Sequence, residues 1–137
     1  MIHKLSENFR FSSLLSPAAI TASAAMTARN FTDGGNNITA TVNVGAITGT
    51  TVSYTAQLQS GPSASGPWTT LDSAVFLNAN ANQFAVLSGR AALTDTHCRI
   101  NEVVSGTTPS ILRSIVASYE SQRSGATLNS NVPSTSA

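Results

Sequence analysis

Asp95, His97 and Cys98 form the one cluster in this sequence whose residue types could support catalysis. A histidine beside a cysteine can activate a thiolate nucleophile. Alternating apolar and polar residues from 97 to 104 predict a strand, however, and neighbouring residues of a strand point to opposite faces. His97 and Cys98 therefore cannot hydrogen-bond to each other, while Asp95 and His97 share a face as a polar pair. We expect no catalytic residues and no enzymatic activity, and we interpret Cys98 as a small buried side chain.

Metal and phosphate chemistry has even less support. The sequence contains two histidines, His3 and His97, and one cysteine, with no cluster of carboxylates around either histidine. Gly34-Gly35 and the loop 61–66 lack the lysine and helix that follow a phosphate-binding loop. We expect neither a bound metal nor a cofactor.

Trp68 and Tyr54 carry a different chemistry, because two aromatic rings can form a stacking platform for sugars. Trp68 directly follows a loop rich in glycine, serine and proline, at residues 61–67. A large ring normally needs a buried face, and a lone tryptophan in a small β domain usually belongs to the core. We interpret Trp68 as a core residue that closes the domain and keep glycan binding as the alternative function.

The composition excludes several classes of partner. Only 9% of the residues are charged, against about 25% in ordinary soluble domains, and the formal net charge is +1. Strong sequence-independent binding to DNA or to acidic membranes needs many basic contacts, which this chain lacks. No apolar run approaches the roughly 20 residues that span a bilayer. We expect neither nucleic acid nor membrane as a partner.

Alternation of period two is the main structural signal. Every second residue from Ile38 to Ala46 is apolar, and the pattern returns from Val52 to Leu58 with Gln57 and Gln59 on the opposite face. Thr48-Gly49 between them supplies a tight turn. We predict two half-buried strands that pair as a hairpin.

Further short strands are expected over residues 19–27, around Phe76, over 84–93, and over 97–104. A last strand is expected over 111–119, where both faces carry apolar residues, which favours a central or interface position. Short strands at intervals of about ten residues, joined by Gly, Pro and Asn turns, predict an all-β, β-sandwich or jelly-roll-like single domain with extended N- and C-terminal arms. The expected division is an N-terminal arm (1–16), a core (17–120) and a Ser/Asn/Thr-rich tail (121–137).

Two stretches of the chain resemble a family of small bacteriophage capsid decoration (cement) proteins. The first is VNVGAITGTTVSYTAQLQSGPSASGPWTTLDSAVF (42–76), and the second is VVSGTTPSILRSIVASY (103–119). The pattern departs at Thr-His-Cys-Arg-Ile before the last hairpin and at the 16-residue leader. The resemblance implies a β-sandwich that forms a homotrimer on the outer surface of the icosahedral head. It also implies terminal arms that reach neighbouring major capsid protein subunits.

The expected function is therefore a structural one, in which the protein stabilises a virion by bridging major capsid subunits. The alternative is a glycan-binding or adhesion module on a phage head or tail. An extended arm of 16 residues reaches about 50 Å, and each buried Phe or Leu contributes about 1.5 to 3 kcal/mol before ordering entropy is subtracted. Arg113 shares a face with two isoleucines and needs a carboxylate or carbonyl partner, which we expect at an interface. The predicted capsid or partner interface comprises Leu5, Phe9, Arg10, Phe11, Leu14, Leu15 and Arg113.

Overall fold

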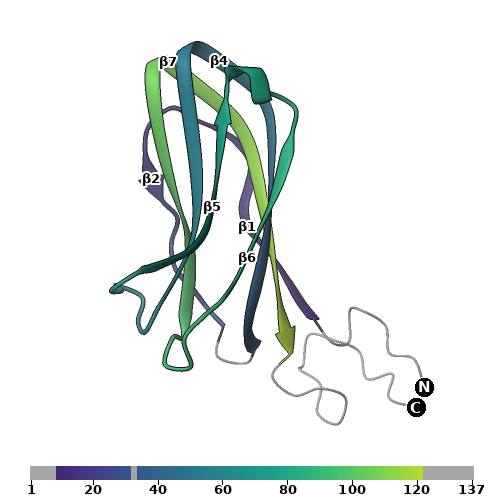
Figure 1. Cartoon of the computed structure of the whole chain (residues 1–137), viewed down its shortest axis with the longest axis vertical. Coiled ribbons are helices and arrows are strands. Elements are labelled where there is room, and N and C mark those ends of the chain that lie inside the picture. Colours follow the sequence, from purple (N-terminus) through teal and green to yellow (C-terminus); the bar gives the residue numbers. More distant parts are fainter. Residues whose placement is uncertain (1–8, 32–33, 122–137) are drawn as a thin grey trace, which may run out of the picture.

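The fold is built on two long strands that pair with each other. The computed structural model describes residues 9–31 and 34–121, and the side chains of residues 14–31 and 37–118. Strands β4 (Gly34–Gly61) and β7 (His97–Ser121) run antiparallel over nearly their whole length. Figure 1 shows the two ribbons bending over together at one end of the molecule. Each long strand therefore supplies one segment to each of two layers.

Glycines make this common bend sterically feasible. The pairing of β4 with β7 shifts register between Val44 and Ser53, where the ribbon turns. Gly49 and Gly106 lie on the two strands at this bend and have φ angles of +110° and +119°. A Cβ on Gly49 would approach the Thr108 carbonyl oxygen to 2.7 Å, which no larger residue tolerates without a shift. The turn residues thus allow both strands to cross from one layer to the other side by side.

The remaining strands complete the two layers. The order in the first layer is β1 (Phe9–Ile20), residues 111–121 of β7, residues 34–48 of β4 and β6 (Phe84–Arg90). The order in the second is β2 (Ala24–Ala25) with β3 (Arg29–Asn30), residues 97–105 of β7, residues 53–61 of β4, and β5 (Thr69–Leu77). A short 3-10 turn, η1 (Asn78–Asn80), leads from β5 to β6. This strand order is that of a jelly roll, so the predicted all-β fold is confirmed.

The inner faces of both layers form one hydrophobic core. Side chains alternate along each strand, so that the apolar set seen in the sequence points inward and the Thr, Ser and Gln set points outward. The largest fully buried apolar side chains are Tyr54, Ile38, Leu58, Leu87, Ile100, Ile111 and Ile115. Within the part of the chain that the structure describes, no helix is long and apolar enough to cross a membrane.

The predicted hairpin between residues 38–46 and 52–58 is wrong, although both segments are strands. They pair with opposite ends of β7, and on their other sides with β6 and β5. The chain bends between layers at Thr48-Gly49 instead of reversing within one layer. Local alternation cannot distinguish these two outcomes, because both leave the same residues facing the core. The expected central position of residues 111–119 is confirmed, since they lie between β1 and β4.

The structure differs from the expected N-terminal arm from Phe9 onward. Residues 9–16 belong to β1, whose pairs with β7 extend from Phe9 and Glu120 to Ile20 and Ile111. Two register shifts, on either side of Leu15, interrupt the alternation and obscured the strand in the sequence. The predicted strand over 19–27 is also divided, because β1 ends at Ile20 and β2 begins in the other layer. Residues 1–8 and 122–137 lie outside the described residues.

A buried ion pair connects the two layers through the core. Glu102, on the second-layer half of β7, is 2% exposed and binds the guanidinium of Arg113, which the first-layer half of β7 supplies. Arg113 donates from Nε to Glu102 Oε2 at 2.6 Å and from Nη2 to Oε1 at 2.8 Å, so the pair is bidentate. The Tyr54 hydroxyl donates to Glu102 Oε2 at 2.6 Å, and Arg113 Nη1 donates to the Ala18 carbonyl oxygen at 3.2 Å. One hydrogen-bond network thus links four segments from both layers.

The network perturbs the protonation of its members. The hydrogen bond to Glu102 raises the pKa of Arg113, which therefore stays charged although it is largely buried. Burial raises the pKa of Tyr54, and the hydrogen bond to Glu102 raises it further. The tyrosine therefore remains a hydrogen-bond donor at any ordinary pH. The sequence analysis expected Arg113 to find a carboxylate or carbonyl partner at an interface. Arg113 has one of each, and both come from its own chain.

Removing one partner of this network should destabilise the fold more than removing the charge on both sides. We expect Arg113→Met to lower the free energy of unfolding by about 3 to 5 kcal/mol, because it leaves the Glu102 carboxylate buried and unpaired. The double variant Glu102→Gln/Arg113→Met should recover most of this loss, since the amide still accepts from Tyr54. Urea unfolding of both variants measures the difference. Equal stability of the single and double variants would show that the buried Glu102 carboxylate does not need Arg113 as its partner.

Candidate functional site

The outer face of the second layer carries a compact set of polar side chains. Inward-facing Ala56 and Leu58 leave Gln57 and Gln59 pointing outward from β4. Strand register then places Asn101 opposite Gln57 and Arg99 opposite Gln59, both on β7. On the other side of β4, Thr70 of β5 lies opposite Gln59. We call the set formed by Gln57, Gln59, Thr70, Arg99 and Asn101, together with Trp68, the amide face.

Hydrogen bonds hold these side chains in fixed orientations. Arg99 Nε donates to Gln59 Oε1 at 2.8 Å, and Gln59 Nε2 donates to Thr70 Oγ1 at 3.1 Å. One row further along, Asn101 Nδ2 donates to Gln57 Oε1 at 2.8 Å. Gln59 is buried, but Gln57, Arg99 and Asn101 are partly exposed and use only part of their hydrogen-bonding capacity, so their amide and guanidinium groups remain for a ligand. The face is therefore preorganised and polar.

Trp68 lies at one end of the amide face, against Arg99. The guanidinium carbon of Arg99 is 4.5 Å from the centroid of the indole, which is a cation–π contact. The ring packs closely over two glycines, since a Cβ on Gly61 would approach Trp68 Cε3 to 3.0 Å and one on Gly66 would approach Cδ1 to 2.8 Å. The Ser63 hydroxyl donates to the Gly66 carbonyl at 2.8 Å and helps to fix the loop that presents the ring.

The interpretation of Trp68 as a core residue is not supported. Its side chain is half-buried and lies outside the hydrophobic core, on the outer side of the second layer. Tyr54 points the opposite way, into the core, so the two rings cannot form one platform. The loop from residue 62 carries Trp68 past the end of β4 and back over its outer face, which alternation in the strands does not reveal.

The Asp95, His97 and Cys98 cluster has no catalytic geometry. Asp95 Oδ2 accepts a hydrogen bond from the Ser60 hydroxyl at 2.6 Å, and His97 Nδ1 lies 2.8 Å from Thr96 Oγ1. Cys98 points into the core, where burial raises the pKa of its thiol to about 11, although the charge of Arg29 opposes this shift. The expected role of Cys98 as a small buried side chain is confirmed. Within the described ranges, no three His, Cys, Asp or Glu residues gather to hold a metal ion.

The residues predicted for a capsid interface are dispersed. Leu14 is buried in the core and Leu15 packs against it, while Arg113 belongs to the internal network. Phe9, Arg10 and Phe11 lie on β1, where the structure describes their backbone pairing with β7 but not their side chains. Leu5 lies outside the described residues. Their role toward a partner stays a prediction.

Another surface escaped the sequence analysis. The outer face of the first layer exposes four large apolar side chains, with Phe84 67% exposed and Val86 also on β6, and with Leu112 and Val116 on β7. Thr41 pairs with both Val86 and Val116, so these two flank one row of the sheet. We call Phe84, Val86, Leu112 and Val116 the apolar face. Alternation along β6 could have indicated the apolar face in the sequence, because Leu87 faces inward and its neighbour Val86 must therefore face outward.

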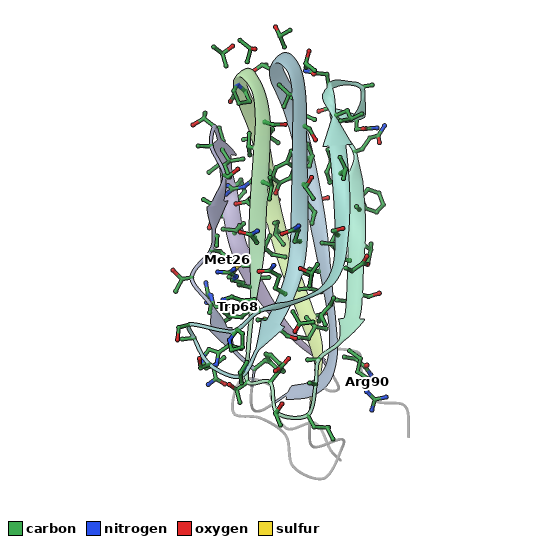
Figure 2. All side chains as sticks on the ribbon, turned by 60° about the vertical axis from the view of Figure 1, so that its left-hand side comes forward. Met26, Trp68 and Arg90 are labelled. Atoms are coloured by element: carbon green, nitrogen blue, oxygen red, sulfur yellow. The ribbon has the colours of Figure 1, made fainter. Side chains whose placement is uncertain are left out.

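The amide face and the apolar face lie on the outer sides of different layers, and Figure 2 shows where three labelled residues lie relative to these layers. Trp68 and Met26 lie on one side of the molecule, and Arg90, at the end of β6, lies on the other. The backbone N–H of Met26 donates to the Ile100 carbonyl oxygen, so Met26 lies at the edge of the second layer beside the amide face. The amide face and the apolar face therefore can act independently.

Comparison with known proteins supports the fold. No protein-family model matches the chain, and no curated protein matches it either. Among solved structures, a xylan-binding domain of carbohydrate-binding module family 22 aligns with a TM-score of 0.50 at 15% identity, over 88% of this chain and 90% of that one. The C-terminal family 22 module of Clostridium thermocellum Xyn10B aligns with a TM-score of 0.49 at 15% identity, over 87% and 89%. The alignment with the xylan-binding domain shows that the chain is similar in fold to a β-sandwich domain over most of its length.

Burial of Cys98 predicts a specific loss of stability in alkali. The folded state holds the thiol proton up to about pH 11, whereas the unfolded chain releases it near 9.0, so the free energy of unfolding should fall as pH rises between these values. The drop attributable to Cys98 is about 2 to 3 kcal/mol. Cys98→Ala should flatten this part of the curve, measured by urea unfolding from pH 8 to 11. Parallel curves for parent and variant would show that the folded protein does not protect the thiol.

Proposed function

We propose that the protein is a non-catalytic carbohydrate-binding module whose ligand site is the amide face. The observation that carries this proposal is the position of Arg99, which lies over the indole of Trp68 and donates to the amide of Gln59 on the outer side of the second layer. Trp68 and Arg99 are partly exposed, whereas Gln59 is buried and supports Arg99 from beneath. Such a set binds a ligand without offering it a nucleophile, a general base or a metal. The proposed activity is therefore recognition of a sugar, without chemical change.

The chemistry of the face matches that of sugar hydroxyls. A hydroxyl both donates and accepts hydrogen bonds, and Gln57 and Asn101 offer amide N–H donors and carbonyl acceptors beside each other. Rows of outward side chains repeat about every 6.6 Å along a strand, so an extended chain of sugar rings can contact more than one row. Because the amides are already cross-linked, little side-chain entropy is lost when a ligand binds.

The fold gives this proposal analogical support. The family 22 domain that aligns over most of the chain is described as xylan-binding, and it is a β-sandwich like this protein. Fold similarity at 15% identity does not transfer a ligand, because one fold serves many functions. The argument for sugar binding therefore rests on the residues of the amide face.

Variants of the amide face should lose polysaccharide binding while remaining folded. Trp68→Ala and the double variant Gln57→Ala/Asn101→Ala should each weaken binding at least tenfold, which corresponds to about 1.4 kcal/mol. Affinity gel electrophoresis against a panel of soluble neutral and acidic polysaccharides measures this loss. Gln83→Ala, an exposed amide before β6, is the matched control. Trp68→Ala should cost only about 1 to 2 kcal/mol of folding stability, below the 3 to 5 kcal/mol of a buried ring.

Two results would contradict the proposal. In one, the parent protein binds none of the polysaccharides. In the other, it binds some of them, but Trp68→Ala and Gln83→Ala bind as well as the parent.

Capsid decoration is the second candidate function, and the apolar face favours it. The apolar face is exposed on a sheet surface whose intervening residues include Thr41 and Asn43, and none of the described side chains between its members is charged. Apolar patches of this kind mark association surfaces. The resemblance to phage decoration proteins adds a proposed setting: a homotrimer on the outer surface of a virion, bound to the major capsid protein. Both functions can coexist, because they use different faces.

Shell binding should depend on the apolar face. We expect the double variant Phe84→Ser/Val86→Thr to co-sediment with undecorated phage heads at least about tenfold more weakly than the parent, since each lost apolar contact removes about 1 kcal/mol or more. The charge-removing variant Arg90→Gln on the same strand is the control. A chain that lacks residues 1–8 tests the arm separately. Undiminished binding of the Phe84/Val86 variant would exclude the apolar face from shell contacts.

A further inference from the structure

We infer that the amide face selects acidic polysaccharides, and that Arg99 pairs with a carboxylate or sulfate group carried by the sugar chain. This inference deepens the proposed function and rests on it, since it names the ligand class of the same site. It depends on the surroundings of Arg99, which is the charged member of the amide face.

The bonding of Arg99 leaves most of its guanidinium available. Its Nε–H donates to Gln59, and its planar group lies over the Trp68 ring. These contacts fix the direction of the side chain but do not neutralise its charge. The two terminal nitrogens carry four N–H donors, arranged as a fork that suits the two oxygens of a carboxylate.

No carboxylate of the described side chains forms an ion pair with Arg99, and each of them has other partners. Glu102 points into the core and binds Arg113. Asp95 accepts from Ser60, and the two oxygens of Asp72 accept from the backbone N–H groups of Ser73 and Ser88. Arg113, in contrast, has its bidentate carboxylate within the chain. Arg99 is thus a preoriented cation on a binding face, with its counter-charge left for the ligand.

An anionic group on the ligand fits this arrangement better than a neutral hydroxyl. A charge-assisted bidentate hydrogen bond is about twice as strong as a neutral one, and contact with the indole removes part of the water that would screen the guanidinium. Gln57 and Asn101 remain available for the hydroxyls of neighbouring rings. The site can therefore recognise both the anionic groups and the hydroxyl groups of an acidic polysaccharide.

The decisive comparison uses polygalacturonate and its methyl ester, which share a backbone and differ in charge. We expect the full-length protein to bind polygalacturonate at least tenfold more tightly than the ester in isothermal titration calorimetry, with affinity falling as salt is raised from about 50 to 500 mM. Arg99→Gln should abolish this preference, so that the variant binds polygalacturonate and the ester with equal affinity. Arg99→Lys should keep part of it, because it retains the charge but loses the fork.

Controls separate the charge at this site from the charge of the whole protein. Arg90→Gln removes one exposed positive charge at the other side of the molecule, and it should keep the full preference. Dextran sulfate against neutral dextran tests whether sulfate can replace carboxylate, and a preference there that Arg99→Gln abolishes supports the same inference with sulfate as the anion. Melting curves of all variants confirm that each is folded, as expected for surface positions.

The outcomes distinguish this inference from the proposed function. Equal binding of acidic and neutral chains, with binding still lost in Trp68→Ala, would overturn the acidic preference and leave sugar recognition intact. A preference that Arg90→Gln weakens as much as Arg99→Gln would overturn the assignment to Arg99. Absence of binding to every polysaccharide would overturn both.

Discussion

The buried pair of Glu102 and Arg113 is the interaction on which the two-layered structure depends. Both residues lie on β7, on either side of the bend where the strand passes from one layer to the other. The carboxylate also accepts from Tyr54 on β4, and the guanidinium also donates to Ala18 on β1. Burying charge is costly, so the pair is stable only in the one register that satisfies all of these groups. We infer that it selects this register against slipped alternatives.

The strand register that forms the core also determines which side chains lie on the outer surface and which of them are neighbours. Because side chains alternate along a strand, a one-residue slip of β4 would send Gln57 and Gln59 into the core and Leu58 out. Pairing of β4 with β7 sets Gln59 beside Arg99, and pairing with β5 sets Thr70 on its other side. The position of the amide face is therefore a consequence of the same hydrogen-bond ladders that hold the core.

Local alternation was enough to predict the strands over residues 38–46, 52–58, 97–104 and 111–119, the side on which most of their residues lie, and the burial of Cys98. It also placed Arg113 on one face with two isoleucines, Ile111 and Ile115, which is where the structure has it, while Glu102 lies on the same face as Cys98 and Ile100. Their mutual contact was not predictable, because it requires knowing that β7 bends over at residues 105–110. The hairpin expected between residues 38–46 and 52–58 is wrong for the same reason, because the sequence does not show that the long strands bend from one layer to the other.

The position of the candidate site was hidden for a related reason. Gln57 and Gln59 were expected to face away from the core, but the sequence contains no sign that Arg99 and Asn101 would be their neighbours across strands. Trp68 was assigned to the core from the usual behaviour of large rings, while Gly61 and Gly66 provide the space that lets it lie outside. The loop geometry that brings Trp68 onto Arg99 depends on contacts between segments far apart in the chain, such as Thr96 with Pro62.

Trp68 is the single tryptophan of the chain, so its indole N–H gives one unambiguous signal in a proton–nitrogen NMR spectrum. Titration of the labelled protein with an oligosaccharide tests directly whether the amide face is the ligand site. The account predicts that this signal shifts on saturation, together with the Gln57 and Asn101 side-chain amides and the Arg99 Nε–H, while signals from the core stay in place. Shifts confined to β6 and the apolar face, with the indole signal unmoved, would contradict it.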